Sequence, residues 1–369
     1  MSRKKQISIS IFEFNYEKEF LMKSQKYIDK NDMYKSIYDF SLHIDQAIGI
    51  GKKINFKKNY NKISNIVLCG MGGSAIGGDL SSSLARHSLS VPVLVNRNYT
   101  LPNWVNNETL VICSSYSGNT EESLSAYHEA LSKGSKIVGI STGGELTSSL
   151  KKNDFDFVIV PSGLQPRAAV SFSFIPLLYI LNEINVINPN LIRKIESASK
   201  KIKNYTQKYC TIKDTNPTYA LAKKIHNTLP IIYGECDLTS AIALRWKGQL
   251  CENSKMLAFY NDIPEMNHNE IVGWQENTDI MKRLSVLWIL DKSTHPRNKL
   301  RFDSSKEILN TLPFLQEEIS LKGETFVERF IHLIHFGDWL SYWCAILHQT
   351  DPTPVKKIDT LKMILSKKS

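Results

Sequence analysis

Apolar segments that alternate with helical patterns set the strongest limit on the fold of this chain. Five such segments in the first half are rich in Val, Ile and Leu, at residues 65–70, 91–96, 109–118, 136–142 and 157–163. Stretches with helical spacing of apolar residues separate them. Strands that are apolar along their whole length are typical of a parallel sheet with helices on both faces. The sequence therefore predicts a doubly wound α/β architecture.

The same pattern returns in the second half. Apolar segments and helical stretches lie there at residues 229–234, 239–253, 255–261, 278–290 and around 327–348. Ser-Ala-Ile occurs at 74–76 and again at 240–242, which is a weak internal repeat. Turn residues at 187–190 separate the halves. We therefore predict two domains, residues 1–190 with a helical N-terminal extension and residues 191–369.

Composition excludes several classes of protein. The net charge is +10, but Lys residues are spread along the chain without a stripe of basic and aromatic residues, so we expect no nucleic-acid partner. The longest apolar stretch, Phe172–Leu181, is too short to span a bilayer and contains Pro176. Residues 1–10 lack the following apolar run of a signal peptide. Six cysteines without a CxxC pair indicate thiols in a reducing cytoplasm, and we predict a cytoplasmic protein without a membrane partner.

A Gly-rich turn follows the first apolar segment. Gly70, Gly72 and Ala75 satisfy the dinucleotide pattern G-x-G-x-x-A, but the second segment ends in Asn96 and Arg97 instead of the acidic residue that would bind a ribose. Three interpretations stay open: a nicotinamide cofactor, a tight turn without a ligand, or a turn that lets ligand oxygens approach the backbone at 72–74. We favour the third and expect no cofactor.

A hydroxyl-rich loop, SSYSGNTEE, occupies residues 114–122 between a predicted strand and a predicted helix. Ligands of open parallel sheets bind at the carboxyl ends of strands, and helix N-termini suit phosphate. Ser115, Ser117 and Thr120 add hydroxyl donors. The alternative is ordinary helix capping by Asn119 or Thr120. Because one cap needs only one hydroxyl, the loop favours phosphate binding.

A carboxylate and an imidazole stand close together in the second half. Glu252 and His268 lie in the polar segment 251–274, which interrupts apolar helix-like stretches. One group can carry a proton between carbons while the other works on a ring oxygen or hydroxyl. With the phosphate loop, the pair predicts acid–base chemistry on a phosphorylated sugar.

Seven segments then resemble one family in order along the chain. They are GMGGSAIGGDL, SYSGNTEE, QPRAA, ENSK, NHNEIVGW, GDWLSYW and DPTPVKKIDTLK. The chain resembles the bifunctional phosphoglucose/phosphomannose isomerases of the sugar-isomerase (SIS) domain superfamily. The resemblance implies two flavodoxin-like SIS domains in a homodimer, a place in glycolysis and gluconeogenesis, and interconversion of fructose 6-phosphate with glucose 6-phosphate and mannose 6-phosphate.

The resemblance also implies roles for individual residues. Glu252 matches the base that moves a proton through an enediolate, and Arg167 matches the arginine that faces this intermediate. His268 matches a ring-opening histidine that the neighbouring subunit contributes. The phosphate would bind at Gly73, Ser74 and the hydroxyls of the loop at 114–122.

A C-terminal lysine assists ring opening in the family. Lys362 in DTLK matches it, and Lys356 and Lys357 are close neighbours that a shift in alignment would exchange for it. We match residues 291–305 to none of the family's segments and predict that they form an added or lengthened loop.

Other functions remain open at this point. A metal-dependent isomerase would need ligands, and His332, His335, Cys344 and His348 stand at helical spacings, but among core-type residues. We therefore expect no metal. A non-catalytic SIS module would bind sugar phosphate and regulate a partner, and a nucleotide-dependent oxidoreductase would use the Gly-rich turn. The combination of Glu252, His268 and Arg167 favours an enzyme.

Overall fold

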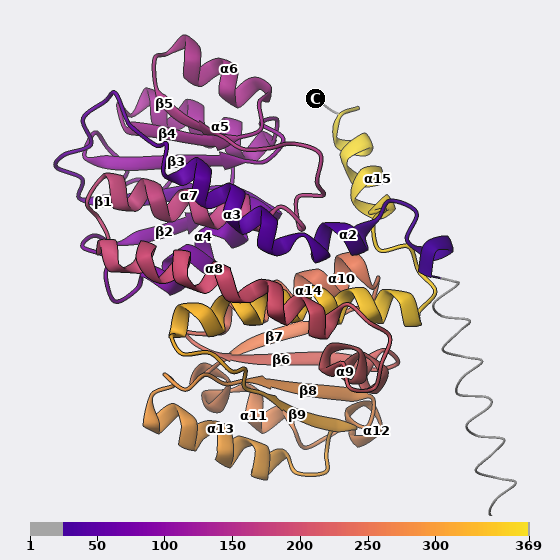
Figure 1. The fold of residues 1–369 in the computed structure, drawn as a ribbon. Helices are drawn as coiled ribbons and strands as arrows, with labels where there is room; N and C mark the ends of the chain where they lie inside the picture. The colour runs from indigo at the N-terminus through magenta and orange to yellow at the C-terminus, as the bar shows by residue number, and fades with distance from the viewer. Residues whose placement is uncertain (1–24, 368–369) are drawn as a thin grey trace, which may run out of the picture.

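The computed structural model describes residues 25–367, and its strands form two parallel sheets (Figure 1). The first sheet has the order β2-β1-β3-β4-β5 and contains β1 (Asn65–Cys69), β2 (Val93–Asn96), β3 (Thr109–Ser115), β4 (Lys136–Ser141) and β5 (Asp156–Ile159). The second has the order β7-β6-β8-β9 and contains β6 (Leu229–Glu235), β7 (Phe259–Ile263), β8 (Leu284–Ile289) and β9 (Leu315–Ile319). The predicted α/β architecture with parallel sheets is confirmed.

Helices cover the sheets and fill the space between them. Those of the first half are α2 (Met33–Tyr38), α3 (Phe40–Gly51), α4 (Gly72–Ala85), α5 (Glu121–Ser132), α6 (Gly144–Lys152) and α7 (Val170–Glu183). Those that follow are α8 (Pro189–Tyr209), α9 (Pro217–Ile225), α10 (Ser240–Asn253), the 3₁₀ helix η1 (Glu265–His268), α11 (Glu270–Gly273), α12 (Thr278–Met281), α13 (Pro296–Leu309), α14 (Phe326–Leu347) and α15 (Lys356–Leu365). Among residues 25–367, none of these helices has the length and apolar character needed to cross a membrane.

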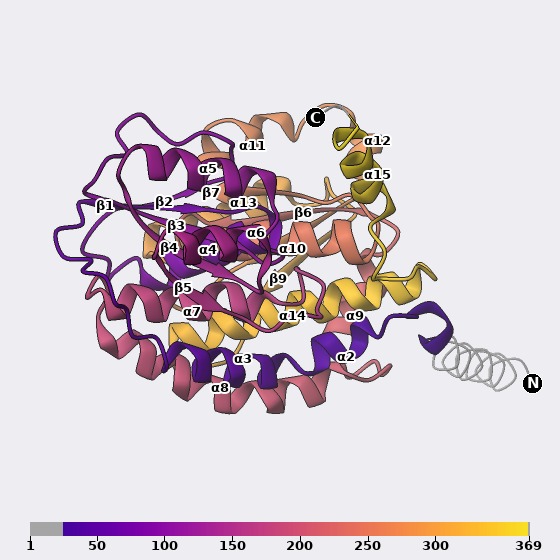
Figure 2. The same cartoon turned by 90° about the horizontal axis from the view of Figure 1, so that it is seen from above.

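Helix α14 lies between the two sheets and joins their cores. All of its residues from Val327 to Ile346 are buried. One hydrophobic cluster contains Leu68 of β1, Leu287 of β8 and the apolar side chains of α14. Figure 2 shows α3, α8 and α14 along one side of the molecule. The two sheets therefore share one apolar core, which fixes their relative position.

The amphipathic helix α8 connects the two halves. Pro189 occupies its first turn and the Asn188 side chain accepts a hydrogen bond from the Asn190 N–H, which starts the helix as capping rules expect. The domain boundary predicted between residues 190 and 191 falls inside this helix. That boundary stays a prediction, and the part of the predicted N-terminal extension at residues 1–24 lies outside the described residues.

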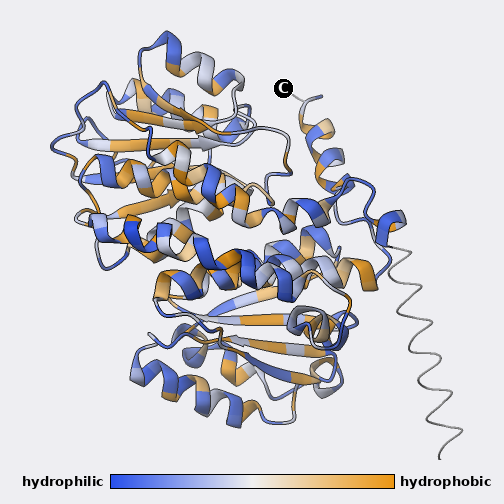
Figure 3. Ribbon diagram, in the orientation of Figure 1, coloured by the Kyte–Doolittle hydropathy of each residue, from blue (hydrophilic) through white to orange (hydrophobic). Residues whose placement is uncertain are grey.

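Two elements of the second half differ from the prediction. The added loop expected at 291–305 is wrong, because helix α13 begins at Pro296 and buries Phe302 and Leu309. Most of its other residues are hydrophilic, as Figure 3 shows, so the chain carries little apolar periodicity there. Strand β9 was not predicted, because it lies at the edge of its sheet and of its five residues only Ile319 is buried.

The strands at 109–118 and 157–163 are shorter than expected. Strand β3 ends at Ser115, and β5 spans Asp156–Ile159. The residues after Ser115 instead form a turn closed by hydrogen bonds from the Gly118 N–H to the Ser115 carbonyl and hydroxyl oxygens. This turn places the hydroxyl-rich loop at the carboxyl end of the first sheet.

A close approach between α10 and α14 gives a stability test. A Cβ at Gly337 would lie 2.2 Å from Nε1 of Trp246, and this indole donates a hydrogen bond to the Leu333 carbonyl at 2.9 Å. We expect Gly337→Ala to lower the free energy of unfolding by about 1–3 kcal/mol in urea denaturation. The control Gly49→Ala in α3, where an added Cβ meets nothing within 4 Å, should raise it by about 0.5–1 kcal/mol. Equal free energies of unfolding for Gly337→Ala and Gly49→Ala would contradict the close packing of α14 against Trp246.

Candidate active site

A cavity lies where the first sheet's α4 meets α10 of the second half. It has a volume of about 160 Å³ and is lined by Gly72 and Gly73 from the start of α4, by Arg167 from the loop after β5, and by Glu252 at the end of α10. Arg97, Arg245 and Lys247 also line it, so in the described chain its walls carry four cationic side chains and one carboxylate. Arg97 is paired with Asp79 and Arg245 with Asp338, so Lys247 and Arg167 are the cationic side chains of the wall that these aspartates do not balance.

Arg167 and Glu252 face each other in this cavity. The Arg167 Nη1 lies 3.5 Å from Oε2 of Glu252, and the arginine side chain is 4% exposed while the glutamate is 36% exposed. Burial lowers the pKa of Arg167, and the Glu252 carboxylate opposes this effect. Arginine keeps its charge in proteins, so the site holds a fixed positive charge opposite a carboxylate that solvent and ligands can reach.

The other guanidinium nitrogens of Arg167 are held by uncharged acceptors. Nε donates to Oδ1 of Asn253 at 2.6 Å, and Nη2 donates to the carbonyl oxygens of Pro352 at 2.7 Å and Thr353 at 2.8 Å. These contacts fix the plane of the group and direct Nη1 toward Glu252. A positioned base beside a fixed cation is the arrangement that proton abstraction next to a carbonyl requires.

Gly73 lets the Gly-rich turn approach the arginine loop. A Cβ at this position would lie 2.6 Å from the Pro166 carbonyl oxygen, so a side chain would push the two loops apart. The neighbouring Ser74 is buried, and its hydroxyl accepts a hydrogen bond from the Tyr116 N–H at 3.3 Å. The structure thus brings Gly73, Ser74, Arg167 and the hydroxyl-rich loop together.

Within that loop, Ser115 is the centre of the turn. Its Oγ lies 2.9 Å from Oγ1 of Thr120 and accepts from the N–H groups of Gly118 at 3.1 Å and Thr120 at 3.4 Å. Gly118 has φ +73°, and a Cβ there would lie 1.8 Å from the Gly143 carbonyl oxygen. Ser117 is exposed at the tip of the turn.

The capping alternative for this loop is wrong. Thr120 is the N-cap residue of α5, but its side chain makes no capping hydrogen bond in the described chain. The Asn119 side chain instead accepts from the Glu145 N–H at 2.9 Å, so it serves the start of α6. The first N–H groups of α5 therefore remain available to a ligand oxygen.

His268 and Lys362 are not brought to Glu252 within this chain. His268 is exposed at the end of η1, and Lys362 is exposed on α15. Neither residue lines the two cavities that contain Glu252 among the described residues. The second of these cavities, of about 800 Å³, is instead lined by Lys356 and Lys357 at the start of α15.

Lys255 is a residue of this site that the sequence did not single out. Its Nζ donates to the carbonyl oxygens of Glu252 at 2.6 Å and Pro352 at 3.0 Å, and it lines the larger cavity. The pKa of Lys255 is lowered to about 8, mainly by partial burial and to a smaller extent by the nearby charge of Arg167. Its position in the ENSK segment, three residues after Glu252, is the sequence feature that could have marked it as a site residue.

The histidines considered as metal ligands have other partners. Nε2 of His332 accepts from the Tyr209 hydroxyl at 2.5 Å, and Nε2 of His335 lies 2.8 Å from Oγ1 of Thr206. Burial lowers the pKa of His332 to about 4 and that of His335 to about 3, so both are neutral near pH 7. Residues 25–367 contain no group of three His, Cys, Asp or Glu side chains arranged for a metal ion.

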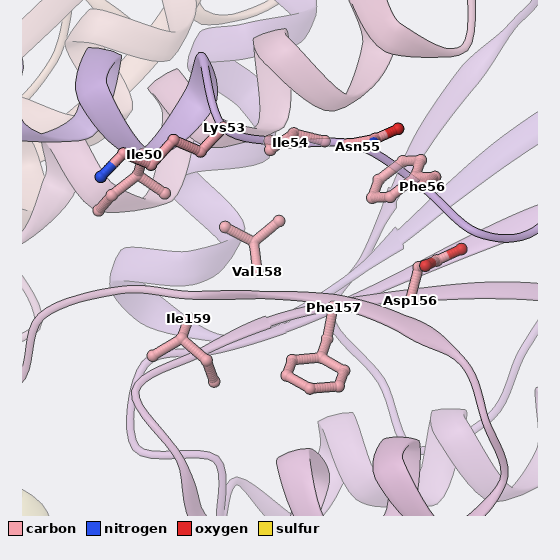
Figure 4. Close-up of a pocket in the computed structure, with 9 residues that line it drawn as sticks. All are labelled: Ile50, Lys53, Ile54, Asn55, Phe56, Asp156, Phe157, Val158 and Ile159. Atoms are coloured by element: carbon pink, nitrogen blue, oxygen red, sulfur yellow. The ribbon is translucent and has the colours of Figure 1, made fainter.

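A separate cavity lies against the edge strand β5 (Figure 4). It has a volume of about 290 Å³ and is lined mainly by apolar side chains such as Ile54, Phe56 and Val158. The Asp156 carboxylate there accepts hydrogen bonds from the backbone N–H groups of Lys57 and Lys58, each at 3.0 Å. Its charge therefore serves the packing of the loop before β1.

Comparisons with known proteins agree with this fold. The model of the family described as bacterial phospho-glucose isomerase C-terminal SIS domain matches residues 214–365. Among solved structures, a hypothetical protein from Thermus thermophilus has a TM-score of 0.72 at 12% identity and covers 95% of this chain and 94% of its own. The C-terminal domain of glucosamine-fructose-6-phosphate aminotransferase from Francisella tularensis has a TM-score of 0.69 at 16% identity, covering 87% of this chain and 98% of its own. These structures share the parallel-sheet α/β fold, and the family model identifies residues 214–365 as a domain of the SIS class.

Proteins with similar sequences show to which family of this class the chain belongs. The bifunctional phosphoglucose/phosphomannose isomerase of Caldicellulosiruptor bescii is 43% identical over 332 residues, which cover 89% of this chain and 98% of the relative. The enzyme of the same name from Aquifex aeolicus is 36% identical, over 84% of this chain and 93% of the relative. The chain belongs to the bifunctional phosphoglucose/phosphomannose isomerase family, and it is an isomerase.

The lowered pKa of Lys255 gives a test of its surroundings. Between about pH 8 and the ordinary lysine value of 10.5, Lys255 binds fewer protons in the folded chain than in the unfolded chain. The free energy of unfolding therefore rises with pH across this window because of this group. We expect the stability of the wild type relative to Lys255→Met to increase between pH 8 and 10.5 in chemical denaturation. If the difference in unfolding free energy between the wild type and Lys255→Met stayed constant with pH, the buried position of Lys255 beside Arg167 would be contradicted.

Proposed function

We propose that the protein interconverts fructose 6-phosphate with glucose 6-phosphate and mannose 6-phosphate through an enediolate. The observation that carries this proposal is the Arg167–Glu252 pair, 3.5 Å apart in a cationic cavity. Glu252 takes a proton from C1 of the opened ketose and returns it to C2, while the proton of the C1 hydroxyl passes to the C2 oxygen; the reverse reaction uses the same carboxylate. Delivery to one face of C2 gives the glucose epimer and delivery to the other gives the mannose epimer.

Arg167 stabilises the charge that develops on the enediolate oxygens. Its guanidinium is already desolvated and fixed by Asn253, Pro352 and Thr353, so it needs no reorganisation when the charge appears. One such donor is worth roughly 2.7–4 kcal/mol of the activation barrier. We expect this reaction to need neither a metal nor a cofactor.

The phosphate of the sugar binds at the carboxyl end of the first sheet. Ser115, Ser117 and Thr120 offer hydroxyls, and the uncapped start of α5 offers N–H groups. The backbone at Gly73 and Ser74 lies beside this loop. Because the phosphate and the reacting carbons lie at opposite ends of the sugar, the loop and Glu252 act on different parts of the substrate.

Ring opening requires a second subunit in this proposal. His268 is exposed and lies outside both cavities of Glu252 in its own chain. A homodimer in which His268 of one chain enters the site of the other supplies the missing acid–base group. Helix α15 has no buried residue, and its exposed apolar side chains include Leu361, Ile364 and Leu365, which supports contact with a second chain.

Lys362 is proposed as the ring-opening lysine on the strength of the family motif. It lies on α15, and Lys356 and Lys357 at the start of that helix line the cavity beside Glu252. We place the enzyme in the cytoplasm, in keeping with six cysteines that all carry free thiols.

The role of Glu252 is tested with Glu252→Gln. We expect kcat for fructose 6-phosphate to fall at least about 100-fold, because the amide has lost the basic oxygen. Calorimetric binding of the sugar phosphate should persist, because the phosphate loop is unchanged. Retained turnover would exclude this carboxylate as the base.

The phosphate loop should show the opposite behaviour. In Ser115→Ala combined with Thr120→Ala, we expect KM to rise roughly 10-fold or more, since hydrogen bonds to charged groups are worth about 1.5–3 kcal/mol. The kcat at saturating substrate should change less than in Glu252→Gln. An unchanged KM would place the phosphate elsewhere.

Subunit mixing tests the shared site. Homodimers of Glu252→Gln and of His268→Ala are each expected to be inactive. After subunit exchange, hybrid dimers contain one site with both native residues, so activity should return to roughly a quarter of the wild-type value when random mixing makes half of the dimers hybrid. Confirmed exchange without recovered activity would show that each chain builds its own site.

A further inference from the structure

The segment GDWLSYW at 337–343 resembles the family but received no role from the sequence. It lies in α14, between the sheets, and contains two buried polar side chains. Asp338 is 3% exposed and Ser341 is fully buried. Both face α10, the helix that ends with Glu252 and Asn253. Burying polar groups in an apolar helix is costly unless they are hydrogen-bonded, so each of them requires a partner.

Asp338 connects α14 to Arg167 through Arg245. Its Oδ1 accepts from Nη2 of Arg245 at 2.7 Å and from Nε2 of Gln249 at 2.6 Å. The same Nη2 of Arg245 donates to the backbone carbonyl oxygen of Arg167 at 3.1 Å. The carboxylate therefore holds the arginine that holds the backbone of Arg167.

Ser341 makes a second connection through Asn253. Its hydroxyl donates to the Asp338 carbonyl oxygen at 2.8 Å and accepts from Nδ2 of Asn253 at 2.9 Å. Because the hydroxyl proton is already used, the amide must turn its NH₂ group toward Ser341. Its Oδ1 is then presented to Nε of Arg167, which it meets at 2.6 Å.

We propose that Asp338 and Ser341 are positioning residues for the isomerase reaction: they act through Arg245 and Asn253 to hold Arg167 opposite Glu252. This inference rests on the proposed function of the Arg167–Glu252 pair. Two chains of hydrogen bonds from α14 reach Arg167, one at its backbone and one at its guanidinium. Together they fix both ends of the residue.

Asp338 has a second effect, on the charge within the cavity. Arg245 lines the same cavity as Glu252, and its ion pair with Asp338 is almost completely buried, with side chains 2% and 5% exposed. The carboxylate neutralises Arg245 and draws its guanidinium toward α14. Arg167 is thereby the arginine whose charge faces Glu252. Without Asp338, Arg245 would be left buried without its counterion and would compete for the base.

Ser341→Ala tests the proposal with the least disturbance. We expect kcat for fructose 6-phosphate to fall about 10-fold, because the Asn253 amide loses the contact that orients it, while KM changes less than about twofold. The matched control is Ser285→Ala at the start of β8. That serine is equally buried, and its hydroxyl accepts from Oγ1 of Thr228 at 2.8 Å. Ser341→Ala loses two buried hydrogen bonds and Ser285→Ala loses one, so the melting temperature should fall in both variants and further in Ser341→Ala, whereas the control should keep wild-type kcat.

Asp338→Asn, measured in the same assay on the full-length protein, is a second test. It keeps the shape of the side chain but removes the charge that neutralises Arg245, so kcat should fall further than in Ser341→Ala. If this variant does not fold, the comparison of kcat between Ser341→Ala and Ser285→Ala tests the positioning role. Equal kcat values for Ser341→Ala and Ser285→Ala would overturn the inference. If Glu252→Gln is inactive in the same assay, only the inference has failed; if Glu252→Gln retains turnover, the proposed function itself has failed.

Discussion

A buried guanidinium that faces a reachable carboxylate is the interaction on which the rest of this site depends. Removing the charge of Arg167 from water is costly, and the chain offsets this cost with an amide oxygen from Asn253 and the carbonyl oxygens of Pro352 and Thr353. Those acceptors come from the end of α10 and from the loop after α14, whereas Arg167 follows β5. The pair therefore forms only when both sheets are assembled around their common core.

Close approach of backbones makes this assembly possible. Gly73 brings the start of α4 against the Pro166 carbonyl, and Gly337 brings α14 against Trp246 of α10. Both contacts tighten the junction in which Arg167 is held. The resulting cavity is lined by Arg97, Arg167, Arg245 and Lys247, and carboxylate partners outside its wall balance Arg97 and Arg245. In the proposed reaction, separate elements of one fold carry out phosphate binding, charge stabilisation and proton transfer.

The sequence allowed the fold and several site residues to be predicted, for physical reasons that also explain the failures. Central parallel strands such as β3 are buried along their whole length and largely apolar, so they can be recognised from the sequence alone. Strand β9 and helix α13 expose most of their surface and carry little apolar signal. Arg167 could be named from its motif, but its contacts with Asn253 and Pro352 join residues 86 and 185 positions apart, which spacing does not reveal. Lys255 stands in the ENSK segment but was not assigned a role, because its contacts are to backbone carbonyls far from any recognisable side-chain pattern.

The most direct measurement is the fate of the transferred proton in heavy water. The account predicts that the wild-type enzyme converts fructose 6-phosphate into glucose 6-phosphate with deuterium at C2, seen as loss of that proton signal by NMR, because a carboxylate exchanges its proton with solvent between abstraction and return. Product that forms at the wild-type rate without any deuterium at C2 would indicate direct hydrogen transfer between the carbons, and it would contradict a base at Glu252.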